Sequence, residues 1–197
     1  MVDRDAWHYL NCMEGHGGRE ISTRHHLIVN TIARYSRLAG AVVIVEPDHL
    51  FETSLRRPDL QITLNYITYL IDVAVTNPMA PSISHKVKTP LAAARMAEKR
   101  KERSYRDALD LYYADGGSNH PTVKCVPLVV EAFGGMGLQA QKFLQALSVH
   151  SRDHLSAWSH YDVVDGLKRA IATALQRGNA MIVLAGYANS ARAFNQS

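Results

Sequence analysis

The chain has 197 residues, of which 47% are hydrophobic and 20% are charged, with a formal net charge of +4. This composition excludes a disordered chain, because the apolar fraction is high and the net charge is small. The longest apolar runs, such as 181–185, fall far short of the ~20 residues of a membrane-spanning helix. The chain opens without a secretory signal pattern, and two cysteines are too few for a disulfide framework. We therefore expect one globular domain in a reducing compartment.

Hydrophobic periodicity and turn residues predict a helix and three strands in the first part of the chain. The opening residues are polar and rich in glycine, which is typical of a loop or a small appendage. In chain order, the patterns predict a helix over 24–38, a buried strand over 41–46, and strands over 60–64 and 66–76 joined by a turn at Asn65.

The second part of the chain predicts mainly helices around one further strand. A loop with three prolines precedes a long helix that opens with three alanines, which are strong helix formers. In chain order, we expect this helix over 91–113, a turn at 115–118, a strand over 124–133, and helices over 138–158, 163–176 and 180–193. The order indicates an α/β domain with a central mixed sheet of about four strands, flanked by helices.

The positive charge is concentrated in one part of the chain. Between Lys86 and Arg106 there are eight basic residues and two acidic ones, so the remainder carries a small net negative charge. A basic stripe on an otherwise neutral domain is typical of a protein that contacts a phosphate backbone. A solvated helix face would give the same pattern, and both interpretations stay open at this point.

Acidic residues stand on apolar strands, where a buried carboxylate is costly unless it is paired or bound to a metal. Glu46 ends the first predicted strand, Asp72 interrupts the third and Glu131 interrupts the fourth. Asp59 stands at the start of the second strand. If the second and third strands form a hairpin about Asn65, Asp59 lies almost opposite Asp72.

Two carboxylates at one end of adjacent strands make a site for a hard divalent cation. We expect Asp59 and Asp72 to hold Mg²⁺ or Mn²⁺, with Glu46 or Glu131 as an additional ligand or an outer partner. The structural alternative is that Asp59 caps a turn and that Asp72 pairs with an arginine.

The long helix supplies one positive group to its apolar face. Lys101 is the one charge in a stripe of small and aromatic residues that includes Tyr105, at spacings of three and four. A lysine aimed at a dicarboxylate metal site can orient the attacking water or stabilise charge on a phosphorane. The alternative is a lysine that extends past small alanines to water. Lys99, Arg100 and Arg103 should point elsewhere, as a solvated or DNA-facing side would.

Six short motifs occur in order along the chain, up to about residue 147. They are Arg24-His25-His26, Val45-Glu46-Pro47, Arg57-Pro58-Asp59, Asp72-Val73-Ala74-Val75, Lys101-x-x-x-Tyr105 and Val130-Glu131-Ala132-Phe133-Gly134-Gly135. Together they resemble the restriction-like endonuclease domain of site-specific non-LTR retrotransposons. That domain is a variant of the PD-(D/E)XK nuclease fold in which the lysine has moved from the strand to the following helix.

The resemblance implies a restriction-endonuclease-like core and hydrolysis of a DNA phosphodiester that leaves a 3′-hydroxyl. In a retroelement this hydroxyl primes reverse transcription, so a reverse-transcriptase domain of the same polyprotein is an implied partner. Tyr105 would pack beside Lys101 or hydrogen-bond to the phosphate. The residues expected on the DNA backbone are Arg24, His25, Lys99, Arg100 and Arg103. His25 could equally be a hydrogen-bonding residue at the start of the first helix. The location would be intracellular, and nuclear for a eukaryotic retroelement.

The chain also departs from the family pattern. Ser104 stands where the family often has a second lysine, so Arg103 or Lys99 would share its role. The segment from Trp7 to Gly18 resembles the end of a zinc knuckle, but no Cys-x-x-Cys precedes His8. His8 and Cys12 alone do not make a structural zinc site. We therefore expect no stoichiometric zinc.

The expected organisation has three parts: a knuckle-like remnant over 1–20, a nuclease core over 21–160, and a helical extension packed on the core over 161–197. Two other functions stay open. One is a non-catalytic nucleic-acid-binding module derived from the nuclease fold. The other is a structure-selective or repair nuclease of the same fold, often dimeric, so a homodimer is also an open alternative. No membrane partner is expected.

Overall fold

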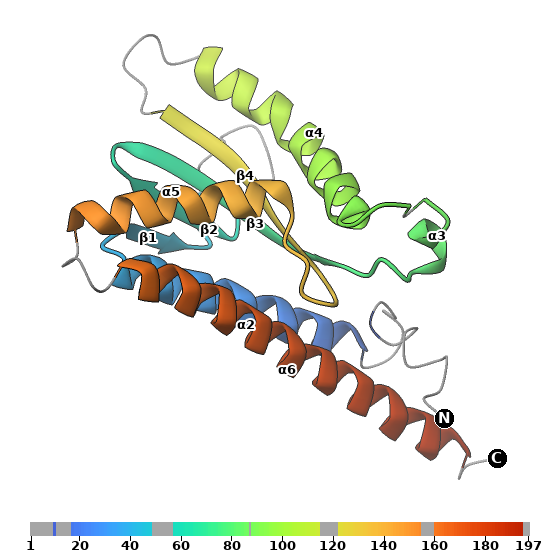
Figure 1. Cartoon of the computed structure of the whole chain (residues 1–197). Coiled ribbons are helices and arrows are strands. Elements are labelled where there is room, and N and C mark those ends of the chain that lie inside the picture. Colours follow the sequence, from blue (N-terminus) through green and yellow to red (C-terminus); the bar gives the residue numbers. More distant parts are fainter. Residues whose placement is uncertain are drawn as a thin grey trace.

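The computed structural model describes residue 10 and residues 17–48, 57–86, 88–114, 122–154 and 160–194. The elements, in chain order, are helix α2 (Gly17–Leu38), strands β1 (Val42–Val45), β2 (Leu60–Leu64) and β3 (Ile67–Thr76), helices α3 (Pro81–Ser84) and α4 (Ala92–Ala114), strand β4 (Thr122–Glu131), and helices α5 (Leu138–His154) and α6 (His160–Phe194). The prediction of an α/β domain with a mixed four-stranded sheet between helices is confirmed (Figure 1). The predicted turn at 115–118 lies outside the described residues.

The sheet has the strand order β1-β2-β3-β4. Strand β2 is antiparallel to both β1 and β3, whereas β4 runs parallel to β3 after the crossover through α4. Asn65 and Tyr66, with φ angles of 45° and 65°, form the two-residue hairpin turn between β2 and β3. Two consecutive positive φ angles are typical of the type I′ turn, whose twist matches the flanking strands.

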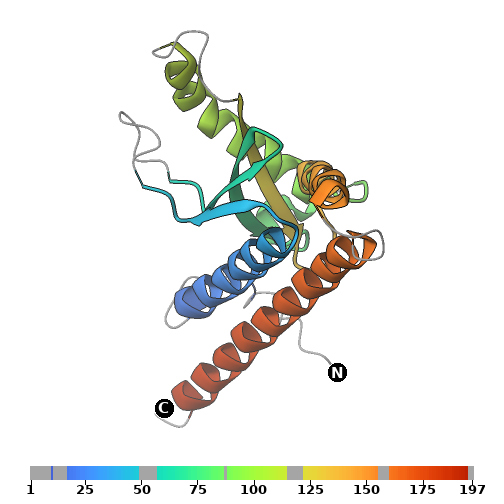
Figure 2. The same ribbon diagram turned by 90° about the vertical axis from the view of Figure 1, so that its left-hand side faces the viewer.

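Helices cover both faces of the sheet (Figure 2). The main core lies between one face and helices α2, α5 and α6, and includes Ile71 and Val73 of β3. Helix α4 covers the other face, where Leu70 packs with Tyr105. Because successive side chains of a strand point to opposite faces, Asp72 faces α4 together with Leu70.

Strand β1 was expected to be buried, and this expectation is wrong. It pairs only with β2 and stands at the edge of the sheet, so Val42 is 67% exposed. Helix α2 begins at Gly17, before the predicted start at 24. The two helices expected over 163–176 and 180–193 form the single helix α6.

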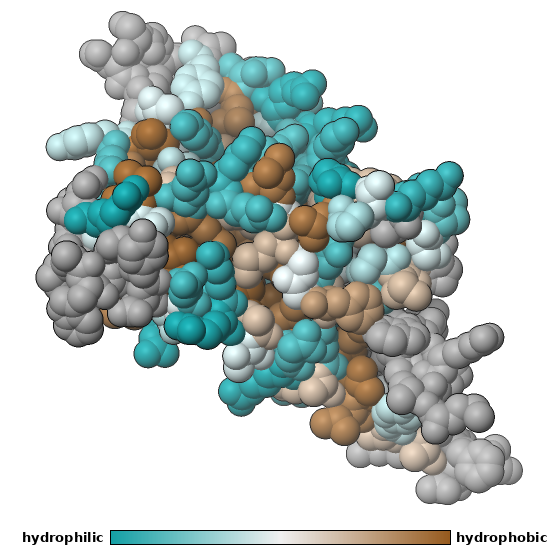
Figure 3. Space-filling view, viewed as in Figure 1, coloured by the Kyte–Doolittle hydropathy of each residue, from teal (hydrophilic) through white to brown (hydrophobic). Residues whose placement is uncertain are grey.

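Helix α6 lies antiparallel along α2, with Gly166 against Tyr35 and Gly178 against Arg24. Its residues Leu167 and Ile171 belong to the main core, so the part of the chain expected as an extension shares that core. The C-terminal half of α6 reaches past the start of α2, and apolar side chains gather on its surface (Figures 1 and 3). None of the described helices is apolar over a long enough stretch to cross a membrane.

Candidate functional site

An ion pair links strand β3 to helix α4. Lys101 Nζ donates to Asp72 Oδ1 at 2.7 Å, and both side chains are largely buried, with 24% and 17% exposed respectively. Lys101 is held there because small residues of α4, Ala94 and Ala97, pack closely on the sheet on the same helix face. The structure therefore brings together the lysine and one of the two carboxylates that the sequence singled out.

The charge on Asp72 depends on its neighbours. Burial raises the pKa of the Asp72 carboxyl, whereas the hydrogen bond and charge of Lys101 and the hydrogen bond from Tyr105 lower it. The negative charge of Asp59 also raises this pKa, which shows that the two carboxylates are close enough to interact. The net effect is a raised pKa, because burial outweighs the contribution of Lys101.

Asp59 lies where the chain bends into β2, and both of its carboxylate oxygens are engaged. His25 Nε2 of α2 lies 3.0 Å from Oδ1, and the backbone N–H of Val73 donates to Oδ2 at 2.6 Å. Val73 follows Asp72 in β3, so this bond fastens Asp59 next to Asp72. The side chain of Asp59 is consequently fixed from two directions.

Tyr105 is buried beneath the two carboxylates. Burial raises the pKa of its hydroxyl above the usual value, and the charges of Asp72 and Asp59 raise it further. The hydroxyl therefore stays protonated and acts as a hydrogen-bond donor. Burial and the charge of Asp72 also raise the pKa of the Cys125 thiol to about 12, so this neighbour is a neutral thiol.

Glu46 lies beside the site but its carboxylate has another partner. Its backbone N–H donates to the carbonyl of Asp59 at 2.8 Å. Its side chain accepts from Arg57 Nη2 at 2.7 Å and lies 3.8 Å from His26 Nε2. Glu46 also has a positive φ of 49°, an uncommon conformation for a residue with a side chain. The arrangement makes Glu46 an outer neighbour of Asp59.

The expectation that Glu131 adjoins the two aspartates is wrong. Asp72 pairs with Pro127 of β4, whereas Glu131 pairs with Thr76, four positions further along. At ~3.3 Å per residue this separation is about 13 Å. Glu131 Oε1 instead accepts the backbone N–H of Ala94 at 3.1 Å, in the first turn of α4. The carboxylate caps the helix that carries Lys101.

Arg24 was expected on the DNA-facing surface, and the structure places it in the interior. It is 4% exposed, and Nη1 donates to Asn179 Oδ1 of α6 at 2.9 Å. Burial lowers the pKa of its guanidinium to about 10. Lys99, Arg100 and Arg103 are exposed on α4, as expected.

The sequence analysis did not predict the two hydrogen bonds that hold Asp59. His25 was expected on the DNA backbone, but it lies against Asp59. The backbone N–H of Val73 also holds Asp59, and a sequence contains no signal for such a bond. The signal for His25 was present, because it stands three residues before the buried Ile28, next to the face that packs on the sheet.

Asp59 and Asp72 can together supply oxygen ligands to a cation. Within the described part of the chain, no group of three or more metal-ligating side chains gathers. Mg²⁺ is commonly bound by one or two carboxylates, with water and substrate phosphate completing its octahedron. The two aspartates fit that donor set, and Lys101 adds a positive charge at the same place.

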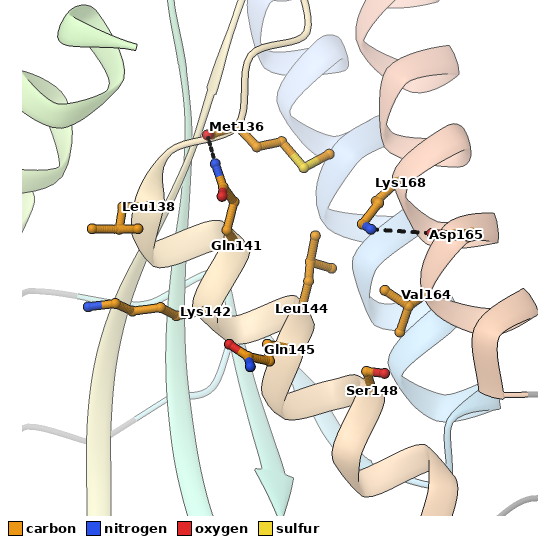
Figure 4. Close-up of a pocket in the computed structure, with 10 residues that line it drawn as sticks. All are labelled: Met136, Leu138, Gln141, Lys142, Leu144, Gln145, Ser148, Val164, Asp165 and Lys168. Atoms are coloured by element: carbon orange, nitrogen blue, oxygen red, sulfur yellow. Dashed lines mark hydrogen bonds and ion pairs between the residues drawn. The ribbon is translucent and has the colours of Figure 1, made fainter. Parts of the chain in front are cut away.

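A separate groove of about 770 Å³ lies between α5 and α6 (Figure 4). Leu144 and Val164 form part of its lining, and Lys168 on its wall is paired with Asp165. The groove is on the face of the sheet opposite to Asp72. It therefore adds no group to the carboxylate site.

No protein-family model matches the chain, and no curated protein shows significant similarity to it.

Proposed function

We propose that this protein is a metal-dependent DNA endonuclease of the restriction-like type found in site-specific non-LTR retrotransposons. The observation that carries the proposal is the 2.7 Å ion pair between Lys101 and Asp72, with Asp59 alongside. The three residues come from strand β3, helix α4 and the bend that precedes β2, and they are the set that the motif order singles out. No other group of described side chains in the chain combines two carboxylates with a buried lysine.

Each residue has a role in phosphodiester hydrolysis. Asp59 and Asp72 would hold Mg²⁺ or Mn²⁺, which supplies charge neutralisation and a bound water of lowered pKa. Lys101 gives a positive charge beside the phosphate, where charge increases in the transition state. Tyr105, protonated and buried, donates a hydrogen bond to the carbonyl of Arg57 at 3.5 Å and so supports the chain just before Asp59. Glu46 acts as an outer neighbour through the Asp59 backbone.

The substrate proposed is DNA, nicked to leave a 3′-hydroxyl. The exposed cations of α4, Lys99, Arg100 and Arg103, are suited to phosphate contacts. In the retroelement setting, the 3′-hydroxyl primes reverse transcription by a reverse-transcriptase domain of the same polyprotein. The resemblance in motif order supports this setting.

A second candidate is a non-catalytic nucleic-acid-binding module. The observation that favours it is that Lys101 already neutralises Asp72, a stable arrangement that needs no metal. The same exposed cations of α4 would then bind nucleic acid without cutting it. Both candidates predict binding, and only the first predicts cleavage.

A nicking assay separates the two candidates. Supercoiled plasmid is incubated with wild-type protein or Asp72→Asn in the presence of Mg²⁺, and relaxed circles are quantified. We expect the wild type to nick, and the variant to lose at least 100-fold in rate, because it removes a ligand charge and the partner of Lys101. EDTA should abolish the wild-type reaction.

The matched control is Asp165→Asn, which also removes a carboxylate paired with a lysine, but on the exposed surface of α6. It should nick at the wild-type rate. Equal nicking by wild type and Asp72→Asn would disprove the catalytic assignment. Binding without nicking by the wild type would favour the non-catalytic module.

A further inference from the structure

The face of the sheet that carries Asp72 is only partly covered. Helix α4 packs mainly on β3 and β4 of this face. Four side chains of β1 and β2 alternate with core residues, point to the same face and are at least partly exposed: Val42, Ile44, Gln61 and Thr63. We call these four side chains the shelf. Two of them are strongly exposed, Val42 at 67% and Ile44 at 47%.

The shelf adjoins the candidate site. Gln61 follows Asp59 by two residues in the chain. It pairs with Leu70 of β3, which precedes Asp72 by two residues. On one face of paired strands, such diagonal neighbours as Gln61 and Asp72 lie about 7–8 Å apart. Ile44 pairs in turn with Gln61, so the shelf is continuous with the surface that holds the two carboxylates.

The shelf carries no charge, in contrast to the exposed surface of α4. Val42 and Ile44 are aliphatic, and within the described part of the chain the Gln61 amide has no hydrogen-bond partner. The Thr63 hydroxyl lies 3.3 Å from that of Thr68. Affinity for a phosphate backbone comes mainly from lysine and arginine, which the shelf lacks. A nucleobase fits it better, because a base has an apolar face and an edge of hydrogen-bond donors and acceptors.

We infer that the shelf is a subsite for an unpaired nucleobase next to the cleaved phosphate. Val42 and Ile44 contact the face of the base, and the Gln61 amide, which can both donate and accept, bonds to its edge. The face of a base is free only after the base leaves its stack, and this costs least where the base is mismatched. The inference rests on the proposed function, and it narrows the substrate class of that site to duplex DNA with an unpaired base at the cut.

The shelf adds a selectivity that the rest of the site does not supply. The carboxylates, through their metal, and the cations of α4 are suited to phosphate groups. Contacts with phosphate carry no information about the bases. A preference for an unpaired base that depends on Gln61 is therefore specific to the shelf.

The test compares the nicking of short end-labelled duplexes in Mg²⁺, one fully paired and the others with a central mismatch that presents each base in turn. The quantity measured is kcat/KM for cuts next to the mismatch. We expect the wild type to prefer a mismatched duplex at least about tenfold, because a paired base is costlier to extrude. Gln61→Leu keeps the size of the side chain but removes the amide, and should lower this preference at least about fivefold. Ile44→Thr keeps a β-branched side chain but removes apolar surface, and should also lower the preference.

The matched control is Gln145→Leu, which removes an exposed amide from α5, on the opposite face of the sheet. Its preference should equal that of the wild type. Thermal unfolding of all three variants, followed by circular dichroism, should be unchanged, because none of the three side chains is buried.

The outcomes separate this inference from the proposed function. If the wild type nicks both duplexes equally, or if Gln61→Leu keeps the preference, the inference alone fails. If the wild type nicks neither duplex, the proposed function fails and the inference fails with it. If Ile44→Thr changes the oligomeric state in light scattering while both shelf variants keep the preference, the shelf is a protein interface and the inference is wrong.

Discussion

At the scale of single residues, the two aspartates share a site but depend on different elements. Asp59 is held by His25 of α2 and by the backbone of Val73, whereas Asp72 is held by Lys101 of α4. The orientation of each carboxylate is thus set by the helix on its own side of the sheet. The affinity for a metal bound by both carboxylates would therefore change with a substitution in either helix.

The contact between His25 and Asp59 leads to a prediction about metal affinity. His25→Ala should weaken Mn²⁺ binding about 10- to 100-fold, because partners of ligand side chains typically contribute this much by fixing the ligand. His25→Gln should retain most of the affinity, since its amide N–H can still donate to Asp59 Oδ1. The measurement is titration with Mn²⁺, following free ion by electron paramagnetic resonance, together with the nicking rate.

The control is His26→Ala, which removes the adjacent imidazole without removing a contact to Asp59. His26 bonds to Ser22 of its own helix and lies near Glu46. Its loss should leave Mn²⁺ binding close to wild type. Wild-type affinity in His25→Ala would show that Asp59 needs no orientation from α2.

Part of the site follows from local sequence rules, and part does not. The hairpin alternation placed Asp59 opposite Asp72, and helical spacing placed Lys101 on the inner face of α4. Both rules depend only on the periodicity of one element. The interior position of Arg24 depends instead on α6, more than 150 residues away. No pattern around residue 24 carries that information.

At the scale of elements, buried carboxylates accept hydrogen bonds from backbone N–H groups in the first turns of two helices. Glu131 accepts the N–H of Ala94 in the first turn of α4, and Glu98 of α4 accepts the N–H of Gln139 in α5 at 2.8 Å. Negative charge is favourable at a helix N-terminus, where backbone N–H groups lack helical partners. A Cβ on Gly137 would overlap the Glu98 carboxylate, so a larger residue there would displace this carboxylate. These acids need no metal to explain their burial.

The capping role of Glu131 predicts different outcomes for two substitutions. Glu131→Gln keeps an acceptor oxygen for Ala94, so both stability and nicking should stay near wild type. Glu131→Ala removes the acceptor and should cost about 1–2 kcal/mol in the free energy of unfolding, as for other lost caps. Urea denaturation and the plasmid assay measure the two quantities. If Glu131→Gln stops nicking while unfolding is unchanged, Glu131 has a direct role in catalysis.

The sequence predicted the elements whose structure depends on local residue patterns. It did not predict features that depend on how the elements pack. Their β-branched and aromatic residues identified β2 and β3, and each strand has buried side chains that pack in the core. Strand β1 is as apolar as a buried strand, but its place at the sheet edge leaves Val42 and Ile44 exposed. The helices predicted over 163–176 and 180–193 are one helix, α6, although Gly178 within it costs about 1 kcal/mol relative to alanine. Contact with α2 along the whole interface outweighs that cost.

At the scale of the whole molecule, α6 joins elements that are distant in the sequence. Asn179 accepts from Arg24 of α2 and donates to the carbonyl of Ala132, which follows β4. Glu131, the preceding residue, caps α4. The C-terminal helix is thereby connected to both helices that flank the two aspartates, so its packing affects the geometry of the site.

The close approach of α6 to α2 predicts that Gly178→Ala is destabilising, although alanine is the better helix former. The added Cβ would lie 2.9 Å from Arg24 Cα, which is backbone and can move only if α2 moves. We expect a loss of about 1–3 kcal/mol in the free energy of unfolding, the usual cost of overpacking.

The matched control is Gly166→Ala on the same interface, whose Cβ would meet the Tyr35 ring at 3.0 Å. A ring can shift, so this variant should be close to neutral, since the gain in helix propensity is about 1 kcal/mol at most. Urea denaturation measures both, and a Gly178→Ala protein as stable as Gly166→Ala would show that α6 can separate from α2 without cost.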